Sequence, residues 1–126
     1  MMMIFLFFLT KKAIESTSLV ELIRVFGNGL DAINFLREHC EDVEALPEII
    51  LLDLSMPIMD GWQFLDQFTK LAPKIDKKIT LYICSSSISP SDVELAKKNN
   101  LVSDYIIKPI TKEKLIDLLK NIIEEI

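Results

Sequence analysis

Short apolar runs alternate with amphipathic stretches along most of the chain. Runs rich in β-branched, aromatic and other apolar residues predict four strands, over residues 22–26, 49–52, 79–84 and 104–107. The run at 49–52 is unbroken, which is typical of a strand covered on both faces. Apolar residues at helical spacing predict helices over residues 30–40 and 62–71 and after residue 111.

Two of the helices have recognisable starts. Ser89 is placed to be an N-cap, with Pro90 at the first helical position and Asp92 in the first turn. Thr111 can cap the last helix. A wide apolar stripe on that helix predicts a buried face, and it is made of Leu115, Ile116, Leu118, Leu119, Ile122 and Ile123.

Strands that alternate with helices at this rhythm indicate a parallel sheet with helices on both faces. In such sheets, ligands bind at the carboxyl ends of the strands. Asp53, Ser85 and Lys108 each follow a different predicted strand. An aspartate can accept a phosphoryl group, a hydroxyl can donate to its oxygens, and an ammonium can neutralise its charge. One such aspartate would be an ordinary loop residue, but the three groups together predict a phosphoryl site.

Composition narrows the class of protein. The 126 residues fit one domain, and with 50% hydrophobic and 26% charged residues the chain is expected to fold. A net charge of −5 with scattered lysine pairs argues against nucleic acid as a partner. Cys40 and Cys84 form no disulfide framework or metal motif, so a cytoplasmic setting is expected. The apolar start, residues 1–9, is shorter than the roughly 20 residues of a membrane span and lacks the basic leader of a signal peptide, so no membrane partner is expected.

Two segments resemble a known family. Residues 51–61, LLDLSMPIMDG, are similar to the phosphorylation segment of response regulator receiver domains, and residues 107–109, IKP, resemble the Lys-Pro signature of that family. The resemblance runs from about residue 4 to the C-terminus. It implies an α/β, flavodoxin-like (CheY-like) fold: a doubly wound parallel sheet with strand order 2-1-3-4-5, forming a single receiver domain over residues 1–126.

The resemblance also implies roles at the phosphoryl site. Asp53 is the expected phosphoacceptor, Ser85 the conserved hydroxyl and Lys108 the invariant lysine. Ser86 adjoins Ser85, so the hydroxyl assignment could shift by one residue. Tyr105 matches the aromatic residue whose rotamer follows phosphorylation, although a half-buried strand aromatic is an equally good interpretation.

Further roles follow for the neighbouring residues. The family binds Mg²⁺, for which Asp53 and the backbone carbonyl of Ser55 are the expected ligands here. Three residues are expected to shape the loop into the next helix, namely Pro57, Asp60 and Gly61. In the family the bond from Lys108 to Pro109 is cis, which would aim the ammonium at the acceptor.

The N-terminus departs from the family pattern. Receiver domains begin with a strand that ends in acidic residues, which hold the Mg²⁺, whereas no acidic residue precedes Glu15 here. The preferred interpretation is an N-terminal truncation, in which Ile4 to Ser16 match the first helix and the first strand is missing. The alternative is that Met2 to Phe8 are the first strand, leaving Lys11 to Ser16 as a short helix. Either way the acidic pair is absent, which makes Mg²⁺ binding doubtful.

Three functions compete. The leading hypothesis is a response regulator of a two-component phosphorelay, which accepts a phosphoryl group from a histidine kinase or phosphotransfer protein and signals to a downstream protein. It would be no enzyme beyond its own phosphorylation and dephosphorylation. The second is a degenerate receiver that binds partners without phosphorylation. A missing first strand could be replaced by the apolar start of the chain or supplied by another copy in a dimer. A phosphatase with an aspartyl nucleophile ranks last, because that chemistry needs a second acid at position 55, which is Ser55.

Overall fold

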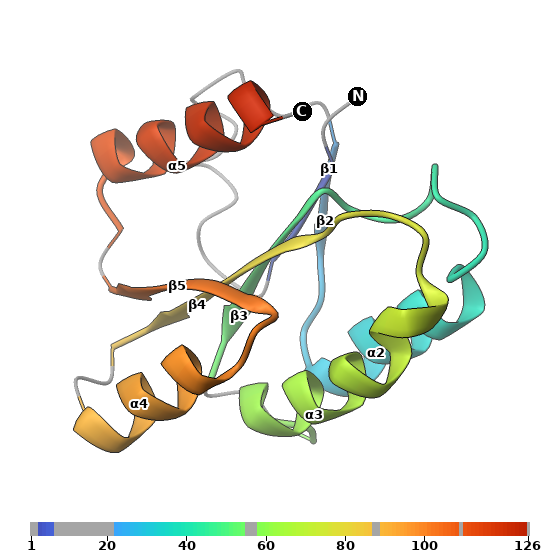
Figure 1. Ribbon diagram of the computed structural model, residues 1–126, viewed down its shortest axis with the longest axis horizontal. Coiled ribbons are helices and arrows are strands. Elements are labelled where there is room, and N and C mark those ends of the chain that lie inside the picture. The colour runs from blue at the N-terminus through green and yellow to red at the C-terminus, as the bar shows by residue number, and fades with distance from the viewer. Residues whose placement is uncertain (1–2, 7–21, 55–57, 87–88, 109, 126) are drawn as a thin grey trace.

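A parallel sheet organises the molecule (Figure 1). The computed structural model describes residues 3–6, 22–54, 58–86, 89–108 and 110–125. The five strands lie in the order β2-β1-β3-β4-β5, which confirms the predicted 2-1-3-4-5 order. Their bounds are β1 Met3–Leu6, β2 Leu22–Val25, β3 Ile49–Asp53, β4 Thr80–Ser85 and β5 Val102–Ile107. All neighbouring strands pair in parallel.

Helices cover both faces of the sheet. They are α2 Gly29–Glu38, α3 Gly61–Leu71, α4 Pro90–Lys98 and α5 Lys112–Glu125, with a short 3-10 turn, η1, at Ala72–Lys74. One buried cluster joins the sheet to α2, α3 and α4, and a second joins it to α5. Figure 1 shows α5 on the opposite side of the sheet from α2 and α3. Strands β3 and β4 are buried at every position because both of their faces pack on helices.

The preferred interpretation, in which the first strand is missing, is wrong, whereas the alternative, in which the apolar N-terminus supplies that strand, is confirmed. Met3–Leu6 form β1, which pairs with β2 on one side and β3 on the other. The side chain of Ile4 is fully buried in the cluster under α5, so these residues do not begin a helix. A gap between β2 and β3 would leave two rows of backbone N–H and C=O groups without sheet partners, which is costly. The apolar start of the chain supplies those partners. Residues 11–16, assigned above to a first helix under both interpretations, lie outside the described residues.

The starts of α4 and α5 largely agree with the starts predicted from the sequence. Thr111 caps α5, since its hydroxyl accepts a hydrogen bond from the amide of Lys114 at 3.1 Å. Ser89 holds the N-cap position of α4, but its side chain makes no capping hydrogen bond and lies 2.9 Å from the hydroxyl of Ser91 instead. Leu115, Leu118 and Leu119 of the predicted stripe are buried.

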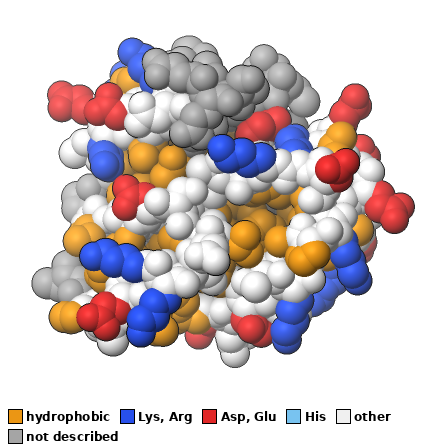
Figure 2. Space-filling model, in the orientation of Figure 1, with side chains coloured by type: hydrophobic (Ala, Val, Ile, Leu, Met, Phe, Trp, Pro, Cys, Tyr) orange, Lys and Arg blue, Asp and Glu red, His pale blue; other side chains and the backbone are white. Residues whose placement is uncertain are grey.

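The surface carries mixed charge. In Figure 2, Lys and Arg side chains lie among Asp and Glu side chains on the face shown. One lysine has a structural role: Nζ of Lys77 donates to the carbonyls of Val43 and Leu46 and to the carboxylate of Glu48, at 2.7 to 3.1 Å. It thereby ties the loop before β3 to the segment before β4. Within the described part of the chain, no helix has the length and apolar character needed to cross a membrane.

Candidate functional site

Three strand ends meet at one edge of the sheet. Asp53 is the last residue of β3 and is 9% exposed, and Ser85 is the last residue of β4 and is 6% exposed. Asp53 pairs in register with Cys84, and Ser85 pairs with Ile107, the last residue of β5. Parallel strands of matched register place their carboxyl ends side by side. A buried carboxylate therefore lies where two neighbouring strands also end.

Lys108 follows β5 directly and reaches back to the end of β3. Its Nζ lies 2.5 Å from Oδ2 of Asp53, in an ion pair between side chains that are 35% and 12% exposed. Fifty-five positions of sequence separate the two residues. The sheet therefore brings the ammonium of Lys108 next to the carboxylate of Asp53, as the positions of both residues at strand ends predict.

Ser85 joins this group through the backbone. The amide of Lys108 donates to the carbonyl of Ser85 at 2.9 Å, which fixes the start of the lysine against the end of β4. Ser85 is buried whereas Ser86 is exposed, so the two candidate hydroxyls differ in their access to solvent. The role of the Ser85 hydroxyl stays a prediction.

The loop after Asp53 is held by the start of α3. Asp60 is the N-cap, and its carboxylate accepts from the amide of Gln63 at 2.9 Å while the Gln63 side chain accepts from the Asp60 amide at 3.0 Å, a capping box. The amide of Gly61 donates to the carbonyl of Leu54 at 3.1 Å. The helix start is thus tied to the residue that follows Asp53.

Gly61 is needed because of this close approach. A Cβ added there would lie 2.6 Å from the carbonyl oxygen of Asp53 and 2.7 Å from Cα of Leu54. Both are backbone atoms, which cannot move aside as a side-chain tip can. Among the described glycines none has a positive φ, so contact and not backbone conformation selects glycine at position 61.

Cys84 also belongs to this neighbourhood, and sequence reasoning did not place it there. Burial raises the pKa of its thiol from 9.0 to about 12, against the smaller lowering effect of Lys108, while Asp53 raises it further. The thiol is therefore protonated at neutral pH. It acts as a small buried apolar group in the cluster under α5 and not as a thiolate nucleophile.

The shifted pKa of Cys84 predicts how stability changes with pH. Above pH 9 the unfolded chain loses the thiol proton while the folded chain keeps it up to about pH 12, so rising pH favours the unfolded state. As the pH rises, the free energy of unfolding should then fall more steeply for the natural sequence than for Cys84→Ala. The difference between the two slopes should be about 1 kcal/mol per pH unit. Urea unfolding across this range measures the slopes, and Cys40→Ala is the control that should retain the steep slope. Parallel curves for the natural sequence and Cys84→Ala would contradict it.

The metal ligands expected from the sequence are only partly described. Asp53 is in place, but Ser55 and Pro57 lie outside the described residues, as does Pro109. Among the residues that the structure describes, no group of three or more His, Cys, Asp or Glu side chains could hold a metal ion. The carboxylate of Asp53 already binds an ammonium. The described residues thus provide the Asp53 carboxylate, already paired with an ammonium, and no larger cluster of ligands for Mg²⁺, which prefers oxygens.

Tyr105, the candidate switch, lies in β5 opposite Ile83 of β4. It is half-buried and packs against the cluster formed with α2, α3 and α4. Its backbone amide donates to the carboxylate of Asp104 at 2.8 Å. This position suits the strand-aromatic interpretation, and its rotamer switch stays a prediction.

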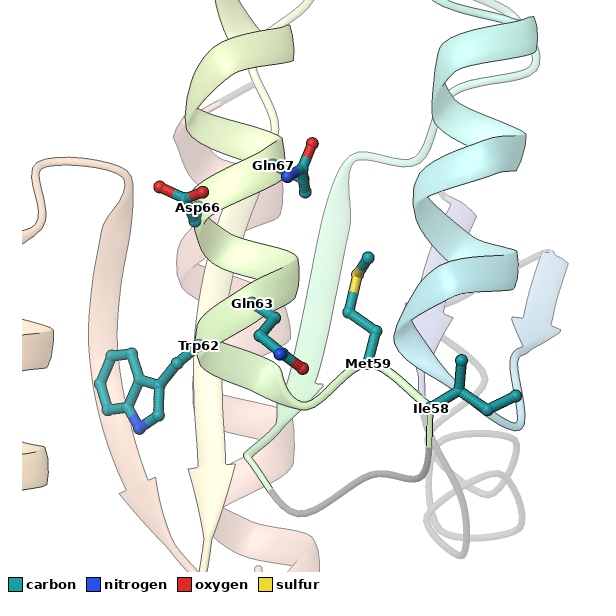
Figure 3. A pocket seen from close by; sticks show the side chains of 6 residues that line it. All are labelled: Ile58, Met59, Trp62, Gln63, Asp66 and Gln67. Atoms are coloured by element: carbon teal, nitrogen blue, oxygen red, sulfur yellow. The ribbon is translucent and has the colours of Figure 1, made fainter.

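A hollow of about 460 Å³ lies beside the start of α3, and Asp53 is not among the residues that line it (Figure 3). It is lined by Ile58, Met59, Trp62, Gln63, Asp66 and Gln67. Trp62 is partly buried and packs against the core. Ile58 is 75% exposed with a φ of 65°, an uncommon conformation for a β-branched residue. The hollow therefore presents apolar side chains a few residues after Asp53.

Comparisons with known proteins agree with this geometry. The sequence model described as the response regulator receiver domain matches residues 5–120. The "Probable methanogenesis regulatory protein FilR2" of Methanothrix harundinacea (strain 6Ac) is 32% identical over 94% of this chain and 72% of that protein. The protein-glutamate methylesterase/protein-glutamine glutaminase of Azospirillum brasilense is 26% identical over 85% of this chain, which spans only 25% of it. A solved two component response regulator from Cytophaga hutchinsonii superimposes with a TM-score of 0.83 and 29% identity, covering 97% of this chain and 96% of that one.

Proposed function

Because the chain belongs to the response regulator receiver domain family, we propose that it accepts a phosphoryl group on Asp53 and signals by a change of shape. Members of this family act in two-component signalling, where receiver domains interact with histidine kinases or phosphotransfer proteins. The observation that carries the proposal is the contact between the Asp53 carboxylate and the Lys108 ammonium at the carboxyl edge of the sheet. A nucleophile and a countercharge for phosphate thus meet in one place.

The reaction at this site is a displacement at phosphorus. A carboxylate oxygen of Asp53 forms the new P–O bond, the P–N bond of a donor phosphohistidine breaks, and its electron pair stays on the imidazole nitrogen. The ammonium of Lys108 lies close enough to balance the negative charge that the transferred group brings. Charge delivered to the end of β3 then acts on its neighbours, with Ser85 and Tyr105 as the proposed responding residues.

Output is proposed to pass through protein contacts in the cytoplasm, without nucleic acid or membrane as a direct partner. The mixed surface charge and the net charge of −5 support a protein partner over a phosphate backbone. The family is generally a signalling domain, so the chain is proposed to have no catalytic activity beyond its own phosphorylation and dephosphorylation.

A second candidate is a degenerate receiver that binds its partner without phosphorylation. One observation favours it: among the described residues, no group of three or more His, Cys, Asp or Glu side chains could hold a metal ion. In that case the ion pair between Asp53 and Lys108 would be a fixed part of the fold. Affinity for the partner would then be the same in Asp53→Asn as in the natural sequence.

Incubation with acetyl phosphate, followed by intact-mass measurement, tests the proposal. The natural sequence should gain the mass of one phosphoryl group, and Asp53→Asn should gain none, because an amide is not a nucleophile for this reaction. Asp66→Asn is the matched control, since Asp66 is an exposed helix carboxylate in a surface pair with Lys70 and should leave the gain intact. No gain with either acetyl phosphate or a histidine kinase as donor would defeat the proposal.

A further inference from the structure

We infer that the site at Asp53 takes no divalent cation and that the ammonium of Lys108 stands in the cation's place. Receiver domains typically bind Mg²⁺, so this chain would differ from its family in the chemistry of its own site. The inference rests on the proposed function, because both concern the carboxylate of Asp53. It rests on the donor set, the occupied carboxylate and the apolar surroundings.

The donor set is too small for a hard cation. Mg²⁺ is commonly bound through more than one protein oxygen, and its remaining ligands are waters or phosphate oxygens. In the described part of the chain, Asp53 belongs to no acidic cluster of metal-binding size. The strand beside it, β1, is followed in the sequence by Phe7, Phe8 and Leu9, and residues 1–14 include no Asp or Glu. The sequence thus provides no carboxylate directly after β1.

The carboxylate that is present already has a cation. Oδ2 of Asp53 lies 2.5 Å from Nζ of Lys108, and the Asp53 side chain is only 12% exposed. A divalent ion at the same carboxylate would have to displace the ammonium or be repelled by it at close range. The amide of Lys108 is bonded to the carbonyl of Ser85, which fixes where the lysine side chain begins. The ammonium therefore starts close to Asp53 and competes with an ion for this carboxylate.

The surroundings do not compensate for this repulsion. The thiol of Cys84, in register with Asp53, is buried among the apolar residues under α5. A sulfur atom there is a poor ligand for a hard ion, which prefers oxygen. Ile49 and Leu51 precede Asp53 along β3 and belong to the same apolar cluster. On this side a cation would thus lose bound water and find no oxygen ligands to replace it.

Mn²⁺ binding, followed by the electron paramagnetic resonance of the free ion, tests the inference without any phosphoryl donor. The natural sequence and Asp53→Asn are compared, with circular dichroism to confirm that both are folded. We expect the Mn²⁺ affinities of the natural sequence and of Asp53→Asn to agree within about threefold. The control Asp66→Asn, which removes one exposed carboxylate, should show an equally small change. A larger loss of affinity in Asp53→Asn than in Asp66→Asn would show a divalent site at Asp53 and overturn the inference.

The phosphorylation assay separates this inference from the proposed function. With acetyl phosphate as donor, the rate in EDTA should lie within about threefold of the rate in Mg²⁺. A rate that depends strongly on Mg²⁺ would overturn the inference and leave the proposed function standing. If no phosphorylation occurs in either buffer, with acetyl phosphate or with a histidine kinase as donor, the proposed function fails, and the Mn²⁺ comparison alone decides the inference.

Discussion

Replacing Gly61 with alanine is expected to lower the free energy of unfolding by about 3 kcal/mol. At most helix positions this substitution is stabilising, because alanine is the better helix former. Here the new methyl group would meet the carbonyl oxygen of Asp53 at 2.6 Å and Cα of Leu54 at 2.7 Å. Relief of that contact requires the helix α3 to move away from the end of β3, which also breaks the hydrogen bond from Gly61 to Leu54.

Urea unfolding followed by circular dichroism measures this change, and the chain provides a matched control. A Cβ added at Gly27 meets no atom within 4 Å, so Gly27→Ala should change the free energy of unfolding by less than about 0.5 kcal/mol. Equal stability of Gly61→Ala and Gly27→Ala would show that the approach of α3 to Asp53 is not as close as the structure has it.

The arrangement of the sheet was largely predictable from the sequence. The unbroken apolar run before Asp53 indicates a strand buried on both faces, and β3 is buried at every position. Strands that alternate with helices must run parallel, and parallel strands bring their carboxyl ends to one edge. The contact between Asp53 and Lys108 follows from that rule alone, across the large sequence separation of the two residues.

Other features depended on tertiary contacts that periodicity does not encode. The apolar start fits a helix or a strand equally well, and only the partners on each side, β2 and β3, make Met3–Leu6 a strand. The sequence alone suggests that Gly61 is a loop glycine. In the structure, glycine is needed there because the carbonyl oxygen of Asp53 lies too close for a Cβ atom. The raised pKa of Cys84 comes from burial by residues of other strands and of α5. Strand register, had it been assigned from the sequence, would have placed Cys84 beside Asp53.

Replacing Lys108 with methionine is expected to slow phosphorylation by acetyl phosphate by about 100-fold, the usual effect of removing a group that stabilises developing charge. Methionine keeps much of the apolar stem and removes the ammonium that lies 2.5 Å from Asp53. The variant should also be less stable by about 1–2 kcal/mol, because a carboxylate that is 12% exposed loses its cation. The assay is therefore run at a temperature where the variant is folded, as judged by circular dichroism.

Two comparisons make the result specific to this ammonium. Lys70→Met removes a lysine that pairs with Asp66 at 3.4 Å on the surface, where both side chains are more than half exposed, and it should leave the rate unchanged because exposed pairs contribute little. Lys108→Arg retains the charge but changes its shape and reach, so it should recover part of the lost rate. If Lys108→Met and Lys70→Met are phosphorylated equally fast, the ammonium does not act on the transferred group, and the pair with Asp53 serves the fold alone.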